Sequence, residues 1–106
     1  MTIQFNTDKN INGNEEFTAP YVAQIEDELS RYSDQITRIE VHLSDEDGNK
    51  NGLNAMRCMI EARLEGRQPI AVTNQSDTRE QAVAGALDKL TASLNTIMGK
   101  LSNHQA

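Results

Sequence analysis

The most regular pattern of hydrophobic and polar positions lies in residues 56–73, MRCMIEARLEGRQPIAVT. Before Gly66, apolar and polar residues alternate with a period of two, which is typical of a strand with one buried face. The inward side is expected to carry Met56, Cys58, Ile60, Ala62 and Leu64, and the outward side Arg57, Met59, Glu61, Arg63 and Glu65. Gly66 supplies a turn, and residues 68–73 resume as a second strand. The segment therefore predicts a pair of strands.

Two more strands are predicted nearer the N-terminus. Residues 2–6 predict a short strand, and residues 35–44 predict a longer one in which Ile39, Val41 and Leu43 face the core. Only the connections from this longer strand onwards are short enough for hairpins. The first strand is therefore joined to the second through the helical segment between them.

Two segments repeat apolar residues at helical spacing, and in the first the expected buried stripe consists of Val22, Ile25, Leu29 and Tyr32. Because proline is tolerated only near a helix start, Pro20 places the start of the first regular helix near Thr18, which can cap it; the helix runs to about Tyr32. The second helix starts at residue 76 or 77, where Asp77 and Glu80 match a capping box. Its apolar stripe consists of Val83, Leu87, Leu90, Leu94, Ile97 and Leu101.

This order of elements predicts an α+β fold, β-α-β-β-β-α, with a four-stranded sheet. Each helix has a single apolar stripe, so we expect both helices on one face of the sheet. Residues 1–101 form a single α+β domain, and residues 102–106 form a frayed tail. The other face of the sheet is left to solvent or to a partner.

Composition narrows the class of protein. The formal net charge of −6 argues against indiscriminate nucleic-acid binding, which relies on Lys and Arg to neutralise phosphates. No apolar run reaches the roughly 20 residues needed to cross a bilayer, and the N-terminus does not resemble a signal peptide. The single cysteine, Cys58, excludes an internal disulfide and fits a reducing compartment. We therefore expect a cytoplasmic protein with no membrane partner.

The sequence contains no catalytic or metal-binding motif that meets its chemical requirements. Residues 45–54, DEDGNKNGLN, predict a polar loop that copies the first half of a calcium loop. The copy consists of Asp47, Asn49, Asn51 and Gly52. Its twelfth position is Cys58, where a bidentate glutamate is required. His42 and His104 are far apart in sequence, and no metal or cofactor is expected.

The outward face of the predicted sheet allows two interpretations. It carries Arg38, His42, Arg57, Met59, Glu61 and Arg63. The arginines beside Met59 form a contact surface in one interpretation. In the other, the face is solvated and its arginines form cross-strand ion pairs with Glu40 and Glu61.

Three pieces of the chain, RIEVHLSDEDG, RCMIEARLEGRQPIAVTNQ and REQAVAGALDKL, resemble in order and spacing the ribosome hibernation promoting factor family. This family includes the ribosome-associated inhibitor proteins, once labelled sigma-54 modulation proteins. The resemblance covers Ile3 to Leu101 and is greatest to short members that carry only the N-terminal domain. It implies a β-α-β-β-β-α fold similar to double-stranded RNA-binding domains, which agrees with the order of elements derived above.

The resemblance also implies a function. It predicts a non-enzymatic factor that binds the 30S ribosomal subunit, occupies the channel for mRNA and tRNA, and inhibits translation in starved cells. Basic side chains would contact phosphates of 16S rRNA, and no DNA is involved. Arg57, Arg63, Arg67 and Lys89 match basic positions of the family, and Arg38 and Arg79 are added from charge and expected exposure. We expect a monomer or a weak dimer.

The first helix departs from the family pattern, because typical members carry several Lys or Arg residues there. In this chain the same surface reads Gln24, Glu26, Asp27 and Glu28, with only Arg31 basic. Two alternatives to a ribosome-binding factor therefore stay open. One is a divergent domain of the same fold that binds a basic protein; the other is an enzyme or metal sensor, for which the sequence supplies no cluster of titratable groups.

Overall fold

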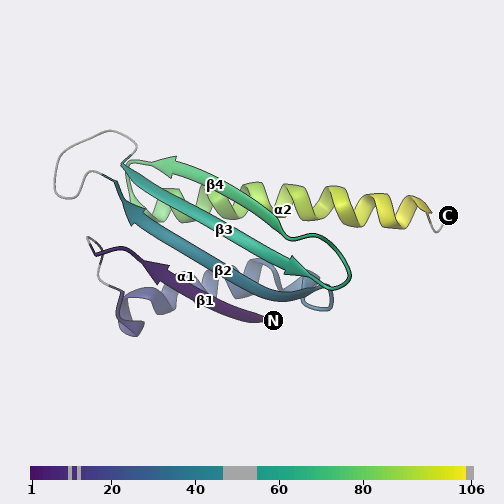
Figure 1. The fold of residues 1–106 in the computed structure, drawn as a ribbon, viewed down its shortest axis with the longest axis horizontal. Helices are drawn as coiled ribbons and strands as arrows, with labels where there is room; N and C mark the ends of the chain where they lie inside the picture. The colour runs from purple at the N-terminus through teal and green to yellow at the C-terminus, as the bar shows by residue number, and fades with distance from the viewer. Residues whose placement is uncertain (10, 12, 47–54, 105–106) are drawn as a thin grey trace.

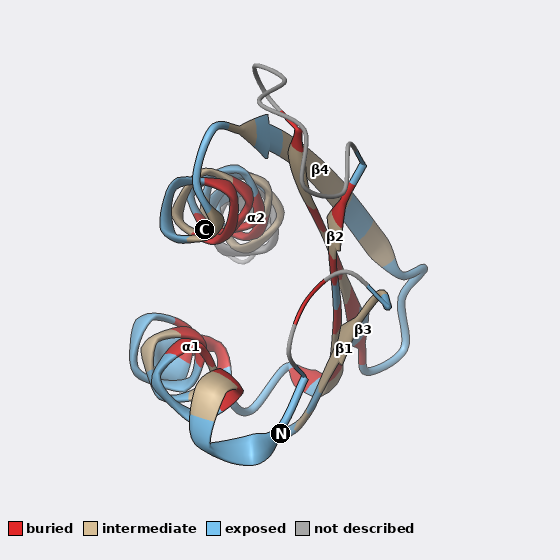
Figure 2. Cartoon of the chain, turned by 90° about the vertical axis from the view of Figure 1, so that its left-hand side faces the viewer, coloured by how far each residue is buried: buried red, intermediate tan, exposed pale blue. Residues whose placement is uncertain are grey.

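The computed structural model describes residues 1–9, 11, 13–46 and 55–104. Its elements are β1 (Thr2–Thr7), α1 (Glu15–Glu28), the 3-10 helix η1 (Ser30–Tyr32), β2 (Ile36–Asp45), β3 (Met56–Leu64), β4 (Ile70–Ser76) and α2 (Arg79–His104). Both helices cover the same face of the four-stranded sheet (Figures 1 and 2). The predicted α+β fold and its β-α-β-β-β-α order are confirmed.

The strands lie in the sheet in their sequence order, β1-β2-β3-β4. β1 pairs in parallel with β2, and α1 makes the crossover that a parallel pair requires. β2, β3 and β4 pair antiparallel as successive hairpins. The turn between β3 and β4 contains Gly66 at φ 72°, a left-handed conformation that glycine adopts without steric cost, as the sequence predicted.

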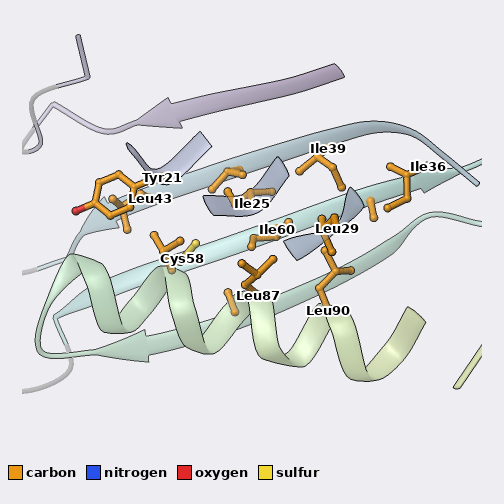
Figure 3. Packing of buried hydrophobic residues seen from close by; sticks show 14 of the residues in the cluster. Tyr21, Ile25, Leu29, Ile36, Ile39, Leu43, Cys58, Ile60, Leu87 and Leu90 are labelled. Atoms are coloured by element: carbon orange, nitrogen blue, oxygen red, sulfur yellow. The ribbon is translucent and has the colours of Figure 1, made fainter. Parts of the chain in front are cut away.

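The core fills the space between the sheet and the two helices. Ile39 and Ile60 from the sheet, Leu87 and Leu90 from α2, and Leu29, which follows the last residue of α1, are fully buried (Figure 3). The expected inward faces of β2 and β3 are confirmed. Two alanines of α2, Ala82 and Ala86, are also fully buried and let this helix approach the sheet closely.

α1 begins at Glu15, earlier than the predicted start near Thr18. The cap is Asn14, whose side-chain oxygen accepts a 2.9 Å hydrogen bond from a first-turn N–H. Asparagine is a stronger cap than threonine, and two glutamates in the first turn interact favourably with the helix dipole. These contributions outweigh the cost of Pro20, which lies inside the helix with its side chain exposed.

β4 continues past Thr73, where the sequence predicted its end. Asparagine is disfavoured in strands, yet Asn74 is held here by α2: its Nδ2 donates to the carbonyls of Gln81 and Ala82 at 3.2 and 3.3 Å. Gly85 makes this contact possible, because a Cβ at that position would overlap the Asn74 amide. The strand is extended by a tertiary contact that no local pattern indicates.

α2 begins at Arg79, and its cap is Thr78, the residue after the predicted Asp77. The Thr78 hydroxyl accepts a 3.1 Å hydrogen bond from the N–H of Gln81. Thr78 and Gln81 have the spacing of a capping box of the threonine–glutamine type. Residues 102–104 are the last of α2, and residues 105–106 lie outside the described part of the chain.

Candidate functional site

The face of the sheet that the helices leave uncovered carries side chains in rows across the strands. The strand register gives the rows Arg38–Arg63, Gln4–Glu40–Glu61–Ala71, Asn6–His42–Met59–Thr73 and Ser44–Arg57–Gln75. One end of this open face therefore holds two arginines beside a row of carboxylates. The other end holds one arginine beside a polar row without a carboxylate.

The arginines at the first end are neutralised by their neighbours. Arg63 lies 3.3 Å from Glu40 and 3.2 Å from Glu61, measured between side-chain nitrogen and oxygen atoms. Arg38 lies 3.8 Å from Glu40 and also donates to Gln4. These are the cross-strand ion pairs that the sequence predicts if the open face is solvated. Solvent-exposed pairs of this kind contribute roughly 0–1 kcal/mol each to stability, so a phosphate can compete for the arginines.

Arg57 lies in a different environment at the other end of the open face. Ser44 and Gln75 flank it, and the adjacent row contains His42 and Met59. Among the described residues, the ion pairs are confined to the first end of the face, and Arg57 takes part in none of them. Arg57 is half-buried, and its guanidinium is not held by any of these ion pairs and can pair with an anionic partner.

Lys89 approaches the same part of the sheet from α2. Its ammonium donates a 2.7 Å hydrogen bond to the backbone carbonyl of Thr73 in β4, the edge strand. Thr73 and Gln75 pair with Met59 and Arg57 of β3, so Lys89 and Arg57 flank one short stretch of β4. An ammonium has three donors, and this bond uses one of them.

The two remaining predicted residues lie apart from this pair. Arg67 is exposed in the turn between β3 and β4, at the far end of the sheet. Arg79 starts α2 on the helix side, where its guanidinium stacks 4.8 Å from the ring centroid of Phe17. The six predicted residues thus do not form one surface. Arg57 on the open face and Lys89 on α2 reach the same stretch of β4 from opposite faces of the sheet, Arg38 and Arg63 pair with carboxylates, and Arg67 and Arg79 lie apart.

Residues 7–102 match the model of the family described as Sigma 54 modulation protein / S30EA ribosomal protein. The chain belongs to this family. None of the curated protein sequences matches it significantly.

Two solved structures show that the fold of this S30EA chain recurs. The N-terminal domain of Thermus thermophilus Protein Y has a TM-score of 0.72 and 22% identity, over 92% of this chain and 99% of that one. A ribosomal subunit interface protein from Coxiella burnetii has a TM-score of 0.63 and 20% identity, over 93% of this chain and 99% of that one. At these identities the likeness shows a shared fold.

The exposed surface of α1 in this S30EA chain has the opposite charge to the Arg57–Lys89 stretch. Exposed carboxylates run along α1, at Glu15, Glu16, Glu26, Asp27 and Glu28. The helix turns Tyr21 to the core where the sequence predicted Val22, and the Tyr21 hydroxyl lies 3.2 Å from Glu80 of α2. Burial and then Glu80 raise the pKa of Tyr21. The departure from the family pattern on the first helix is therefore an exposed acidic surface.

The thiol and carboxylates of this chain do not assemble into a reactive centre in the described part. Cys58 is fully buried, and burial raises the pKa of its thiol to about 12, so it is protonated at neutral pH. The described residues contain no group of three His, Cys, Asp or Glu side chains that could hold a metal ion. The calcium-like residues 47–52 lie outside the described residues. No described helix is long and apolar enough to cross a membrane.

Proposed function

We propose that this chain is a cytoplasmic ribosome-associated factor that binds the 30S subunit through 16S rRNA, occupies the channel for mRNA and tRNA, and thereby inhibits translation. It acts by occupying a site, without catalysis, metal or cofactor. Membership of the S30EA family supports the ribosome as partner. The observation that carries the proposed contact is the placement of Arg57 and Lys89 on two sides of one stretch of β4.

In this proposal, the Arg57–Lys89 stretch binds RNA through its phosphates. Arg57 supplies a guanidinium that fits phosphate oxygens, and Lys89 supplies an exposed ammonium with free donors. His42, Thr73 and Gln75 add hydrogen-bonding groups in the same rows. Contacts of this kind read the shape and charge of structured RNA without reading its sequence.

The other arginines contribute less to RNA binding in this proposal. Arg38 and Arg63 must exchange their contacts with Glu40 and Glu61 for a phosphate, so part of the gain is lost. With few phosphate contacts, we expect modest affinity and a salt dependence of about 0.7–0.9 log units in affinity per log unit of salt for each contact.

Sedimentation tests the proposal. The protein is mixed with purified 30S subunits or 70S ribosomes at two salt concentrations, and bound protein is measured in the particle fractions of a sucrose gradient. We expect Arg57→Glu and Lys89→Glu each to weaken association by about tenfold, since each reverses a charge at a phosphate contact. Arg67→Glu is the matched control, because it makes the same charge change in the distant turn.

Equal losses in all three variants would contradict the Arg57–Lys89 contact and indicate that only net charge matters. Wild-type protein that stays off ribosomes at low salt would contradict ribosome binding itself. Channel occupancy is tested separately, because bound protein should then block mRNA and tRNA binding to the same 30S particles. If the protein, mRNA and tRNA bound the same 30S particle together, channel occupancy would be overturned.

A further inference from the structure

An apolar groove runs between α1 and the edge strand β1, on the side of the molecule away from the Arg57–Lys89 stretch. Side chains of Ile3 and Phe5 from β1 and Val22 from α1 line it, and all three are only partly buried. Ala19 and Ala23 of α1 complete its apolar lining. Ile3 and Phe5 pack against the core on their inner sides, and the part of their surface that stays exposed is available to a partner.

Carboxylates border this groove at both ends. Glu15 and Glu16 line it at the start of α1, and Glu26 lines it near the end of the helix. Asp27 lies beside Glu26 in an adjoining hollow. Within the described part of the chain, no basic side chain forms an ion pair with any of these carboxylates. The groove therefore has an apolar middle and two acidic ends.

Within the described part of the chain, no strand pairs with the outer edge of β1 along this groove. β1 forms the outer edge of the sheet (Figure 1). The N–H of Asp8 bonds to the carbonyl of Leu43 at 3.2 Å, which continues the parallel ladder. Because alternate residues of a parallel strand face its partner, Ile3 and Phe5 direct their backbone groups outward. An exposed edge with unpaired backbone groups is a template for an added strand.

We infer that this groove binds an extended, basic segment of a partner protein as an additional strand beside β1. The acidic ends are separated by the α1 residues 15–26, about 16 Å at 1.5 Å per residue. Two residues four positions apart on one face of an extended strand lie about 13 Å apart, and the reach of their lysine side chains covers the difference. Side chains at alternate positions point to one face. A fitting segment therefore has basic residues at its first and fifth positions, an apolar residue at the third, and any residue at the second and fourth. The apolar side chain enters between Phe5 and Val22, and the basic ones meet the carboxylates.

The charge of the groove disfavours two other partners, a second copy of this chain and RNA. A second copy of this chain would bring its own acidic α1 against this one, and the net charge of −6 opposes such pairing. RNA phosphates would be repelled by the carboxylates at both ends. This inference goes beyond ribosome binding and does not depend on it, because the groove and the Arg57–Lys89 stretch use different residues.

A synthetic peptide tests the inference directly. The probe is acetyl-Ser-Lys-Thr-Val-Thr-Lys-Ser-amide, titrated into the protein by calorimetry and by NMR at two salt concentrations. We expect saturable binding that weakens with salt, together with slower hydrogen exchange of the Ile3 and Phe5 amides. The same peptide with glutamate in place of lysine should not bind. Equal binding of both peptides, or unchanged exchange of both amides, would overturn the inference.

Backbone methylation of the peptide tests the strand geometry. Two peptides are compared, one N-methylated at its two threonines and the other at its lysines and valine. In an added strand, the amides of one set point toward β1 and those of the other point away. One methylated peptide should therefore lose binding while the other keeps it. Equal effects of the two would exclude strand addition.

Matched charge variants test the acidic ends. Glu16→Lys combined with Glu26→Lys should weaken peptide binding by about tenfold or more. Asp34→Lys combined with Glu65→Lys makes the same change in net charge at exposed sites outside the groove and should leave binding nearly unchanged. Similar losses in both pairs would contradict the assigned site. Arg57→Glu should keep peptide binding, which separates this result from the ribosome experiment.

Discussion

The open sheet face and the outer surface of α1 both carry several carboxylates, but they use them differently. On the sheet, Glu40 and Glu61 lie against Arg38 and Arg63 and largely cancel their charge. On α1, the carboxylates have no ion-pair partner among the described residues. In that part of the chain, the unpaired negative charge behind the net charge of −6 is therefore concentrated on α1.

This difference changes what net charge implies about the protein. A chain of net charge −6 is a poor nucleic-acid binder if its charge is spread evenly. Here the Arg57–Lys89 stretch lies across the sheet from the acidic helix. At physiological salt, charges further apart than about 8 Å are largely screened from one another. Two surfaces of opposite sign can thus coexist, one suited to phosphates and the other to a basic peptide.

The largest expected effect comes from breaking the core that holds the two surfaces apart. Leu90 of α2 is fully buried, so Leu90→Ala should lower the free energy of unfolding by about 2–5 kcal/mol. Urea denaturation monitored by circular dichroism measures the change. Lys89→Ala, at the exposed neighbouring position, is the control and should have a much smaller effect. Equal stabilities of the Leu90 variant and the wild type would mean that α2 packs on the sheet through another face.

Much of this fold was predictable because its local signals agree with one another. The alternation in β2 and β3, the stripe of α2 and the turn at Gly66 all act over a few residues. The structure confirms the strands, the turn and the stripe from Val83 to Leu94. The predicted start of α1 was wrong because the cap at Asn14 outweighs the cost of Pro20 inside the helix. The end of β4 was wrong because Asn74 is stabilised by α2, a contact between segments that the local pattern does not contain.

The candidate site was less predictable than the fold. The sequence identifies which residues are basic and on which face they lie, and it placed Arg38, Arg57 and Arg63 on the open face correctly. It does not show that Arg63 lies between two carboxylates, or that Lys89 reaches β4. Both facts depend on strand register and helix packing. The groove beside β1 was missed because Val22 had been assigned to the buried stripe.

The two ends of α1 give a smaller effect whose sign depends on position. Glu15 lies in the first turn, where a carboxylate is stabilised by the helix dipole, whereas Glu28 lies in the last turn, where it is destabilised. Glu15→Gln should therefore lower the free energy of unfolding by about 0.3–1 kcal/mol, and Glu28→Gln should raise it by a similar amount. Urea denaturation at low salt measures both. Changes of the same sign would show that repulsion among the acids of α1 outweighs the dipole.

The smallest expected effect tests the comparison most directly. Glu40→Gln removes the carboxylate that lies near both Arg63 and Arg38. It releases Arg38 from its ion pair and leaves Arg63 with Glu61 alone, so both guanidinium groups bind phosphate more readily. Since an exposed ion pair contributes about 0.2–1 kcal/mol, ribosome association should strengthen by roughly 1.4- to 5-fold, with a steeper dependence on salt. Glu26→Gln makes the same change in charge on α1 without releasing an arginine, and it should alter association less. Sedimentation at two salt concentrations compares the two variants. If both strengthen association equally, the ion pairs on the sheet have no separate role, and total charge alone governs binding to the ribosome.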